Sequence, residues 1–456
     1  MTDRKIYKPP LLRQLSVGPM GKHDVVKVKS VSGDIVIPDI DELLQDYGSP
    51  LFIVCEELLR SLYNDFLEYF SSSNLDTRIA YSYKTNYLPA VCSVFAQEGA
   101  LAEVVSGMEY NLARALGVPG SEIVFNGPYK TRQEIDLAIT DRALINIDGF
   151  DDLALVEASA RSLRRKARIG LRINFRAENQ LDWDKFGFSI EQGETDEVLK
   201  KLVGSRYLAL EALHNHCGTF NLEPSIYERS IKTLISVART AHRLGLEPHI
   251  FDLGGGFPSD NMLKSEFAGT TGGYNRSGVL NAFADAILKP LNRARKSFGP
   301  TVTLMLEPGR AIVDRAVQLA CTVVATKEIS GENAAIVDAG VNILPTAYWY
   351  DHPVNAIANG STVDMRPVTI YGPLCMQIDR LRKGALLPPL ESGMRLIFEN
   401  VGAYCLTQSM QFIQPRPAVI MLGSEGPMLI RRREEWRDIF ALDSVPKRLR
   451  RNGYEF

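Results

Sequence analysis

The chain has 456 residues, of which 45% are hydrophobic and 23% charged, and its formal net charge is -2. This balance gives no electrostatic footprint for nucleic acid or for an anionic membrane, so a small molecule is the expected partner. The length exceeds what one ordinary core needs and predicts two domains, although a (β/α)8 barrel alone takes up about 250 residues.

Targeting signals and disulfides are not expected. No apolar run reaches the roughly 18 residues of a membrane helix, and the N-terminal segment has charges and prolines in place of a signal-peptide core. The cysteines are scattered and form no CxxC pair. They are Cys55, Cys92, Cys217, Cys321, Cys375 and Cys405. We therefore expect reduced thiols and a cytoplasmic protein.

Residues 1–47 are expected to form N-terminal strands outside any barrel. The segment 25–37 holds two alternating runs about Ser32 and Gly33, which is typical of a β-hairpin. We expect these strands to pack with the C-terminal sheet.

Residues 48–310 are predicted to form a (β/α)8 barrel. Apolar runs typical of strands alternate with segments that place apolar residues at i, i+3 and i+4, as helices packed on a parallel sheet do. The eight strand candidates are 78–84, 101–106, 122–127, 143–148, 168–174, 208–216, 248–255 and 303–309. Eight strands joined by such helices favour closure into a barrel.

Residues 311–456 are predicted to form a mostly β second domain. Strand-like runs at 317–329, 333–341, 363–373, 394–404 and 417–423 are separated by Gly, Pro and Asn turns. The fold class is therefore α/β: a barrel plus a β-barrel or sandwich domain that also takes in the N-terminal strands.

Polar and glycine residues stand at the carboxyl ends of the predicted barrel strands, where this architecture places its reactive groups. They are Lys84, Glu103, Arg172, His216, the run Gly254-Gly255-Gly256, and Glu307 with Arg310. A glycine run after a strand leaves backbone N–H groups free to approach a phosphate, and a carboxylate ending an apolar strand suits a protonated ring nitrogen. Each also has a plainer interpretation: a surface lysine, a tight turn, and a salt bridge from Glu307 to Arg310.

Nine motifs in order resemble those of the fold-type III decarboxylases that use pyridoxal 5′-phosphate (PLP), the family of diaminopimelate, ornithine and arginine decarboxylases. This family is related in fold to alanine racemase. The matching segments lie at 81–86, 103–107, 123–127, 185–187, 214–219, 252–257, 307–310, 372–375 and 402–404. The resemblance covers residues from about 20 to 425 and implies decarboxylation of an amino acid or an amino-acid conjugate.

The resemblance implies a role for each matching residue. Lys84 would hold PLP as a Schiff base, His216 would stack on the pyridine face, and Glu307 would pair with the ring nitrogen. Glu103 and Arg172 match a supporting acid–base pair behind the histidine. The residues that match the family's phosphate positions are Thr219, Gly254, Gly255, Gly256, Gly309, Arg310 and Tyr404.

Cys375 lies in the predicted β domain, within the segment Gly-Pro-Leu-Cys. In the family this cysteine reaches the active site of the other subunit and protonates the decarboxylated carbon, which implies an obligate homodimer with shared sites. The plain alternative is a buried cysteine that serves as a small hydrophobic side chain.

The chain departs from the family pattern where the substrate's distal end is recognised. Met376 stands where an acidic residue normally meets the distal ammonium of diaminopimelate, and Leu344 stands where an arginine meets its distal carboxylate. Asp351 matches an aspartate that contacts the distal amine in ornithine decarboxylases. These three residues and Asp379 are the expected substrate contacts. Because buried charges without partners cost several kcal/mol, the departures argue against free diaminopimelate and favour a neutral, conjugated or carrier-bound substrate.

Other classes are less well supported by the sequence. An alanine racemase sets an arginine, not a glutamate, against the ring nitrogen. A single-barrel PLP-binding protein needs no second domain, and a regulatory relative without cofactor usually lacks the lysine or the glycines. Metal catalysis is unsupported, because the six histidines show no HExxH or paired-cysteine spacing. Diaminopimelate, ornithine or lysine decarboxylation and amino-acid racemisation remain the alternatives.

Overall fold

The computed structural model describes residue 35 and residues 37–176, 185–264, 276–299, 301–357 and 364–451. The chain divides into two compact units. The first, here called the barrel unit, contains Glu56–Ala316 and Trp349–Asp351, and the second, the sheet unit, contains the described residues up to Cys55, Val317–Tyr348 and the chain from His352 onward. The hairpin predicted over 25–37 lies almost entirely outside the described residues.

The barrel unit is a closed parallel barrel of eight strands, as predicted. Each strand is hydrogen-bonded to its neighbour in chain order, and the last strand pairs with the first. The strands are β2 (Asp76–Ser82), β3 (Leu101–Val104), β4 (Ile123–Phe125), β5 (Leu144–Ile147), β6 (Ala167–Asn174), β8 (Leu208–His214), β9 (Ile250–Asp252) and β11 (Thr303–Leu306). All eight strand candidates are confirmed.

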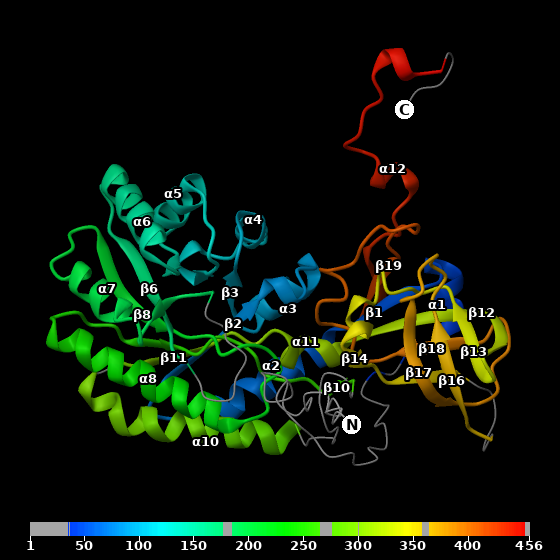
Figure 1. The fold of residues 1–456 in the computed structure, drawn as a ribbon, viewed down its shortest axis with the longest axis horizontal. Helices are drawn as coiled ribbons and strands as arrows, with labels where there is room; N and C mark the ends of the chain where they lie inside the picture. Colours follow the sequence, from blue (N-terminus) through cyan, green and yellow to red (C-terminus); the bar gives the residue numbers. More distant parts are fainter. Residues whose placement is uncertain are drawn as a thin grey trace, which may run out of the picture. The chain divides into compact units, whose positions relative to one another are not determined.

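Helices connect the strands and surround the barrel (Figure 1). They are α2 (Glu56–Phe70), α3 (Pro89–Gln97), α4 (Gly107–Ala115), α5 (Arg132–Asp141), α6 (Phe150–Leu163), α7 (Glu194–Leu202), α8 (Pro224–Arg243), α10 (Arg276–Ala294) and the short α11 (Arg310–Val313). Local sequence fixes their ends: Thr131 and Glu134 form a capping box at the start of α5, which satisfies backbone N–H groups that the helix leaves open.

The sheet unit is a mostly β fold, as predicted. Its strand order is β17-β16-β13-β12-β1-β19-β20, and β18 pairs with both β12 and β15. The strands are β1 (Leu51–Cys55), β12 (Val317–Ile329), β13 (Glu332–Val337), β15 (Val354–Ile357), β16 (Arg366–Tyr371), β17 (Arg380–Leu387), β18 (Arg395–Phe398), β19 (Ala418–Gly423) and β20 (Gly426–Arg431). Helices α1 (Ile40–Tyr47) and α12 (Trp436–Ile439) accompany them.

The observed units differ from the expected boundaries at 47/48 and 310/311. Strand β1, expected within the barrel segment, is instead central in the second sheet, antiparallel to β12 and parallel to β19. Its sequence Leu-Phe-Ile-Val-Cys is apolar on both faces, which suits an interior strand of either sheet, so only pairing decides its place. The units therefore separate after Cys55 and after Ala316.

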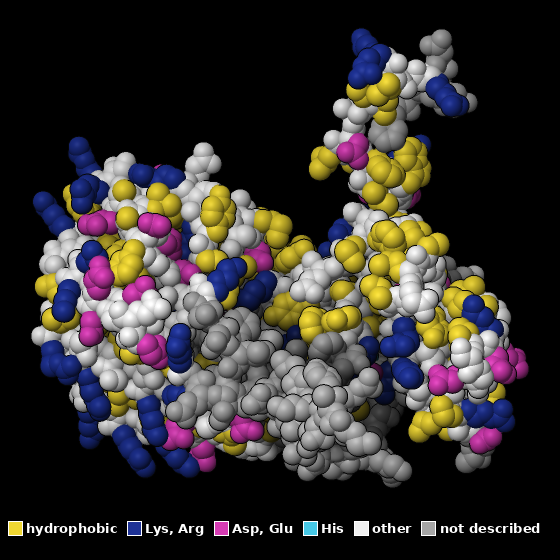
Figure 2. Space-filling model, viewed as in Figure 1, with side chains coloured by type: hydrophobic (Ala, Val, Ile, Leu, Met, Phe, Trp, Pro, Cys, Tyr) yellow, Lys and Arg dark blue, Asp and Glu magenta, His cyan; other side chains and the backbone are white. Residues whose placement is uncertain are grey.

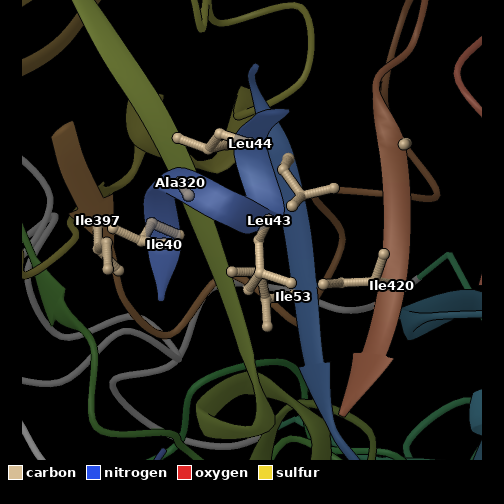
Figure 3. Close-up of a cluster of buried hydrophobic side chains, with 9 residues drawn as sticks. Ile40, Leu43, Leu44, Ile53, Ala320, Ile397 and Ile420 are labelled. Atoms are coloured by element: carbon tan, nitrogen blue, oxygen red, sulfur yellow. The ribbon is translucent and has the colours of Figure 1, made fainter. Parts of the chain in front are cut away.

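A cluster of aliphatic side chains joins α1 to this sheet (Figure 3). Ile40, Leu43 and Leu44 of α1 belong to one buried cluster with Ile53 of β1 and Ile420 of β19, and Ile40 lies beside Ile397 of β18. The apolar positions 40, 43, 44 and 47 follow the i, i+3, i+4, i+7 spacing of an amphipathic helix. The N-terminal part of the chain is thus tied to the second unit by hydrophobic burial.

The outer faces of the barrel helices are charged. Figure 2 shows Lys and Arg side chains gathered along the edge formed by α8 and α10, two helices that pack side by side. Some of these charges pair along one helix, as in Lys232–Glu228 and Lys289–Asp285. Among the described residues, none of the helices is both long and apolar enough to cross a membrane.

Replacing Ile53 by alanine is expected to lower the free energy of unfolding by about 2–5 kcal/mol, because its side chain is fully buried among aliphatic neighbours. Denaturant unfolding followed by circular dichroism measures this change. The matched control is Ile357→Ala in β15, where the side chain is 44% exposed and the change should stay below about 1 kcal/mol. Equal losses in both variants would contradict the assignment of β1 to a core.

Candidate active site

The floor of the candidate site is the layer of inward-facing polar side chains at the carboxyl ends of the barrel strands. It follows from the alternation of side chains along each strand. In a β-strand, residues two apart face the same side, so each inward apolar residue of the barrel is followed two positions later by another inward residue. The inward apolar layer comprises Ala80, Leu101, Val124, Leu144, Ala212, Ile250 and Met305. Two positions on, at the carboxyl end of each strand, every residue is polar.

This polar layer comprises Ser82, Glu103, Asn126, Asn146, Arg172, His214, Asp252 and Glu307. All except Arg172 are buried. On β6 the apolar position is Gly170, and a Cβ there would lie 1.9 Å from Oδ1 of Asn146, so only glycine leaves room for that amide. Eight polar side chains therefore converge inside one end of the barrel.

Lys84 follows β2 on a short 3-10 helix (Tyr83–Thr85). Its Nζ donates to Ser82 Oγ at 2.7 Å and to Glu103 Oε2 at 2.5 Å. The lysine side chain is 37% exposed although its carboxylate partner is fully buried. The amine thus stands above the polar layer and remains accessible from the mouth of the barrel.

Glu307 is a buried carboxylate with two polar side chains beside it. Asn126 Nδ2 donates to its Oε1 at 2.7 Å, and His214 Nε2 lies 3.6 Å from its Oε2. Burial pushes the pKa of Glu307 upward, but His214, Lys84 and Asn126 together pull it below the ordinary value of a carboxyl. Glu307 is therefore ionised, and the alternative of a salt bridge to Arg310 is not what the structure shows.

The expected pairing of Glu103 with Arg172 is also not observed. Glu103 receives hydrogen bonds from Ser82, Lys84 and Asn126, whereas Arg172 pairs with Asp148 at 3.3 Å. Topology explains the difference, because β5, which Asp148 follows, is the neighbour of β6, while β3 lies farther round the barrel. The guanidinium of Arg172 also stacks on Phe186, 4.2 Å from the ring centroid.

The glycine run after β9 passes close to other backbone. A Cβ on Gly255 would lie 2.5 Å from the Glu307 carbonyl oxygen, and one on Gly256 would lie 2.5 Å from that of Gly218. Gly254 and Gly256 have φ values of 61° and 91°, which glycine adopts without strain. The run is therefore required by both space and conformation.

The expectation that this run leaves its N–H groups free needs correction. Gly254 N–H donates to Asp252 Oδ1 at 2.9 Å, and Gly255 N–H donates to His216 Nδ1 at 3.1 Å. Within the described part of the chain only Gly256 of the three has no acceptor for its N–H. The first two glycines thus position side chains, and the third is available to an anion.

His216 is held as a neutral imidazole. Its Nδ1 accepts from Gly255, so the proton of the neutral ring resides on Nε2. Burial, reinforced by the charges of Arg172 and Lys84, lowers the pKa of His216 to about 3. A neutral ring suits stacking on a flat aromatic ligand.

Arg310 begins α11, directly after Gly309, where a Cβ would overlap the side chain of Thr85. The guanidinium lies 4.7 Å from the ring centroid of Tyr350 and 5.8 Å from that of Phe220.

Tyr350 belongs to β14 (Tyr350–Asp351), which pairs with β10 (Met262–Leu263) inside the barrel unit. Of the four expected substrate contacts, Asp351 is thus the one that the barrel unit contains.

The remaining predicted residues other than Thr219 lie in the sheet unit. Cys375 is the one exposed cysteine of the six. Asp379 is buried, and its carboxylate accepts from the backbone N–H groups of Val341 and Leu374 at 2.8 and 2.7 Å. A Cβ on Gly372 would lie 2.4 Å from the same carboxylate. Asp379, expected to touch substrate, therefore holds the loop that presents Cys375.

Leu344, Met376 and Tyr404 also lie in the sheet unit. Leu344 is fully buried and directly precedes a 3-10 helix (Pro345–Tyr348). Met376, which follows Cys375 in the sequence, is partly buried. Tyr404 has a φ of 66°, a conformation uncommon outside glycine. Thr219, in the barrel unit, is partly buried in the loop after β8.

Several residues of the floor were not assigned from the sequence. Asn126, Asn146, His214, Asp252 and Asp148 bind the predicted residues or lie beside them. The first four stand two residues past the last inward apolar residue of their strands, and this position is the signal that finds them; Asp148 lies two residues beyond Asn146. That signal becomes usable once the strand ends are fixed.

A groove between α8 and α10 is unrelated to this site. It is lined by charged side chains of both helices, including Glu228, Lys232, Arg239, Asp285 and Arg293. It lies on the outer helices and not at the strand ends, so it is a solvated helix face.

Comparison with known proteins agrees with this geometry. Residues 59–314, more than half of the chain, match the family model described as the pyridoxal binding domain of pyridoxal-dependent decarboxylases. Diaminopimelate decarboxylase of Methanocaldococcus jannaschii is 28% identical over 449 residues, which cover 94% of this chain and 98% of the relative. That of Helicobacter pylori J99 is 29% identical over 420 residues, covering 88% and 97%.

Solved structures show the same fold. Diaminopimelate decarboxylase of M. jannaschii in complex with L-lysine has a TM-score of 0.81 at 28% identity, covering 94% of this chain and 100% of that one. A lysine/ornithine decarboxylase of Vibrio vulnificus with putrescine has a TM-score of 0.69 at 23% identity, covering 84% and 97%, and supports the fold alone.

The residues fit pyridoxal phosphate. An accessible amine, an ionised carboxylate at the barrel floor, a neutral imidazole and a close-packed glycine loop match the cofactor's aldehyde, ring nitrogen, ring face and phosphate. Lys84, Glu307, His216 and Gly256 would hold these four parts in turn. PLP is accordingly the cofactor.

Neutral His216 makes the stability of the cofactor-free protein depend on pH. An unfolded histidine, with a pKa of about 6.5, takes up a proton on acidification, whereas the folded one stays neutral down to about 3. The stabilisation is therefore complete above about pH 6.5 and is lost as the pH falls, by about 1.4 kcal/mol per unit.

Denaturant unfolding between about pH 7 and pH 5 tests this expectation. Wild-type protein should lose about 2 kcal/mol more over this range than His216→Phe, which has no imidazole to protonate. Identical pH slopes in the two proteins would show that His216 does not titrate as described.

Proposed function

Because this chain belongs to the family of pyridoxal-dependent decarboxylases and is a PLP-dependent carboxy-lyase, we propose that it decarboxylates an amino acid or aminoacyl conjugate whose distal end lacks the charges of diaminopimelate. The observation that carries the substrate part of the proposal is the pair Leu344 and Met376, a buried leucine and a partly buried methionine where the family has an arginine and an acid. Neither side chain can pair with a charge, so a distal carboxylate or ammonium there would be left uncompensated.

The floor of the barrel supplies the electrostatics of the reaction. When bound, PLP supplies an electron sink for the pair released as CO₂ leaves. We propose that the negative charge of Glu307 stabilises a protonated ring nitrogen, and the hydrogen bond from Asn126 holds the carboxylate in place. This arrangement, together with the family match, favours decarboxylation over racemisation.

Proton transfer is assigned to two side chains. Lys84 Nζ, which donates to Glu103 and Ser82, is proposed to carry the cofactor and to exchange a proton with the substrate amine. The Sγ–H of the partner subunit's Cys375 is proposed to protonate the α-carbon after the bond to the carboxylate breaks. The exposure of Cys375 and the hold of Asp379 on its loop support this role.

The second candidate substrate is a free diamino acid. The similar proteins from M. jannaschii and H. pylori are named diaminopimelate decarboxylases, and their similarity spans nearly their whole length. Asp351, in the barrel unit beside Tyr350, is one acidic group that could meet a distal ammonium, such as that of ornithine or lysine.

The six free cysteines suit a reducing compartment, and we propose that the enzyme is cytoplasmic.

CO₂ release from PLP-loaded protein distinguishes these substrates. The panel contains diaminopimelate, ornithine, lysine, arginine, glutamate and conjugated forms, with Lys84→Ala as the inactive control. We expect little release from diaminopimelate and at least about tenfold more when Met376→Glu and Leu344→Arg are combined, because each restores a charge partner. Rapid diaminopimelate turnover by the wild-type enzyme would overturn the substrate proposal.

Shared active sites in an obligate homodimer predict complementation between two inactive variants. Lys84→Ala and Cys375→Ala should each be nearly inactive alone. Co-expression should restore about a quarter of wild-type activity, since half of the dimers then contain one intact site of two. A mixture as inactive as its components would show that Lys84 and Cys375 act within one chain.

A further inference from the structure

A second acid lies beside Glu307 in the floor of the barrel. Asp252 ends β9, opposite His214 in the register of β8 and β9 and opposite Met305 in that of β9 and β11. One ring nitrogen of His214 and one carboxylate oxygen each of Asp252 and Glu307 lie within 4.8 Å of one another, and all three side chains are buried. Two carboxyl groups thus share a dry site beneath the predicted position of the cofactor ring.

The two acids differ in their partners. Glu307 receives a hydrogen bond from Asn126 and faces His214, whereas Asp252 receives one backbone hydrogen bond, from Gly254 to its Oδ1. Its Oδ2 is buried and has no donor within reach. An ionised Asp252 would leave that oxygen desolvated and unpaired next to another negative charge, which is strongly unfavourable.

A proton on Asp252 Oδ2 removes this conflict, since the oxygen then becomes a donor and Glu307 is the acceptor beside it. The titratable groups that face the pair from the surrounding strands are consistent with this assignment: Lys84, Glu103, Arg172, His214 and His216. Lys84 and His214 favour the charge on Glu307, while burial and the charges of Glu307 and Glu103 raise the pKa of Asp252 well above its usual range. The proton therefore belongs to Asp252.

We propose that Asp252 is a positioning residue that stays protonated at neutral pH and donates a hydrogen bond to Glu307, fixing this carboxylate against the cofactor's ring nitrogen. The inference rests on the proposed role of Glu307. Asp252 also ties that carboxylate to the glycine loop, because its other oxygen accepts from Gly254. One side chain thereby links the predicted ring-nitrogen and phosphate ends of the site.

The matched variants are Asp252→Asn and Asp252→Ala. Asparagine keeps an oxygen to accept from Gly254 and an N–H to donate to Glu307, but it cannot carry a negative charge. We expect the cofactor Kd and its visible absorption spectrum in Asp252→Asn to stay close to wild type, with Kd within about threefold. Asp252→Ala should weaken PLP binding by about tenfold or more and make the cofactor spectrum depend on pH, because Glu307 loses a charge-assisted partner.

Infrared spectroscopy of the holoenzyme tests the proton itself. Wild-type protein at neutral pH should show the C=O stretching band of a protonated carboxylic acid that is missing in Asp252→Asn. Subtraction of the two spectra removes signals common to both, such as that of buried Glu109, whose pKa burial raises to about 7. Neither readout needs a substrate, so a wrong substrate assignment leaves both intact.

The opposing model is an ionised Asp252 paired with a protonated His214. It predicts that Asp252→Asn is as defective as Asp252→Ala and that the infrared difference shows no protonated acid. Either result overturns the proposal. A failure of Asp252→Asn to fold or to retain PLP also overturns it, because a neutral side chain of the same shape should suffice.

Discussion

The ionised carboxylate of Glu307, buried inside one end of the barrel, is the constraint that organises the rest of the site. A charge removed from water is tolerated only where hydrogen bonds and opposite charges replace the lost solvation. Asn126 provides a hydrogen bond, and His214 and Lys84 lower the pKa of Glu307 and so favour its charged form. The polar layer therefore contains a hydrogen-bonded network in which Glu103, Asn126, Asn146 and Glu307 are positioned by one another.

Closure of the parallel sheet makes this network geometrically possible. Each of the eight strands contributes one polar side chain at its carboxyl end, and the two-residue period directs all of them inward above an apolar layer. The glycine loop after β9 then brings backbone to within contact of His216 and Glu307. The same loop orients the imidazole through the Gly255 N–H, so the proposed ring stacking and the proposed phosphate binding would depend on one segment.

The sheet unit exposes one thiol, that of Cys375, for which we propose the role of proton donor. Five of the six cysteines are buried or partly buried, but Cys375 is exposed on a loop whose backbone is fixed by the carboxylate of Asp379. The tight approach of Gly372 to that carboxylate leaves no room for a side chain. The loop is thus held rigid by a buried acid while its cysteine remains accessible.

The sequence by itself determined the barrel, the mostly β second domain and the position of Lys84, His216 and Glu307 after barrel strands, because apolar periodicity and short motifs are local properties of the chain. It did not reveal that β1 belongs to the second sheet, since five apolar residues suit an interior strand of either unit and long-range pairing chooses between them. It also paired Glu103 with Arg172 and left Asp252 and His214 without a role. Those partners are set by which strands lie side by side after the barrel closes, a relation between distant segments that only the tertiary structure decides.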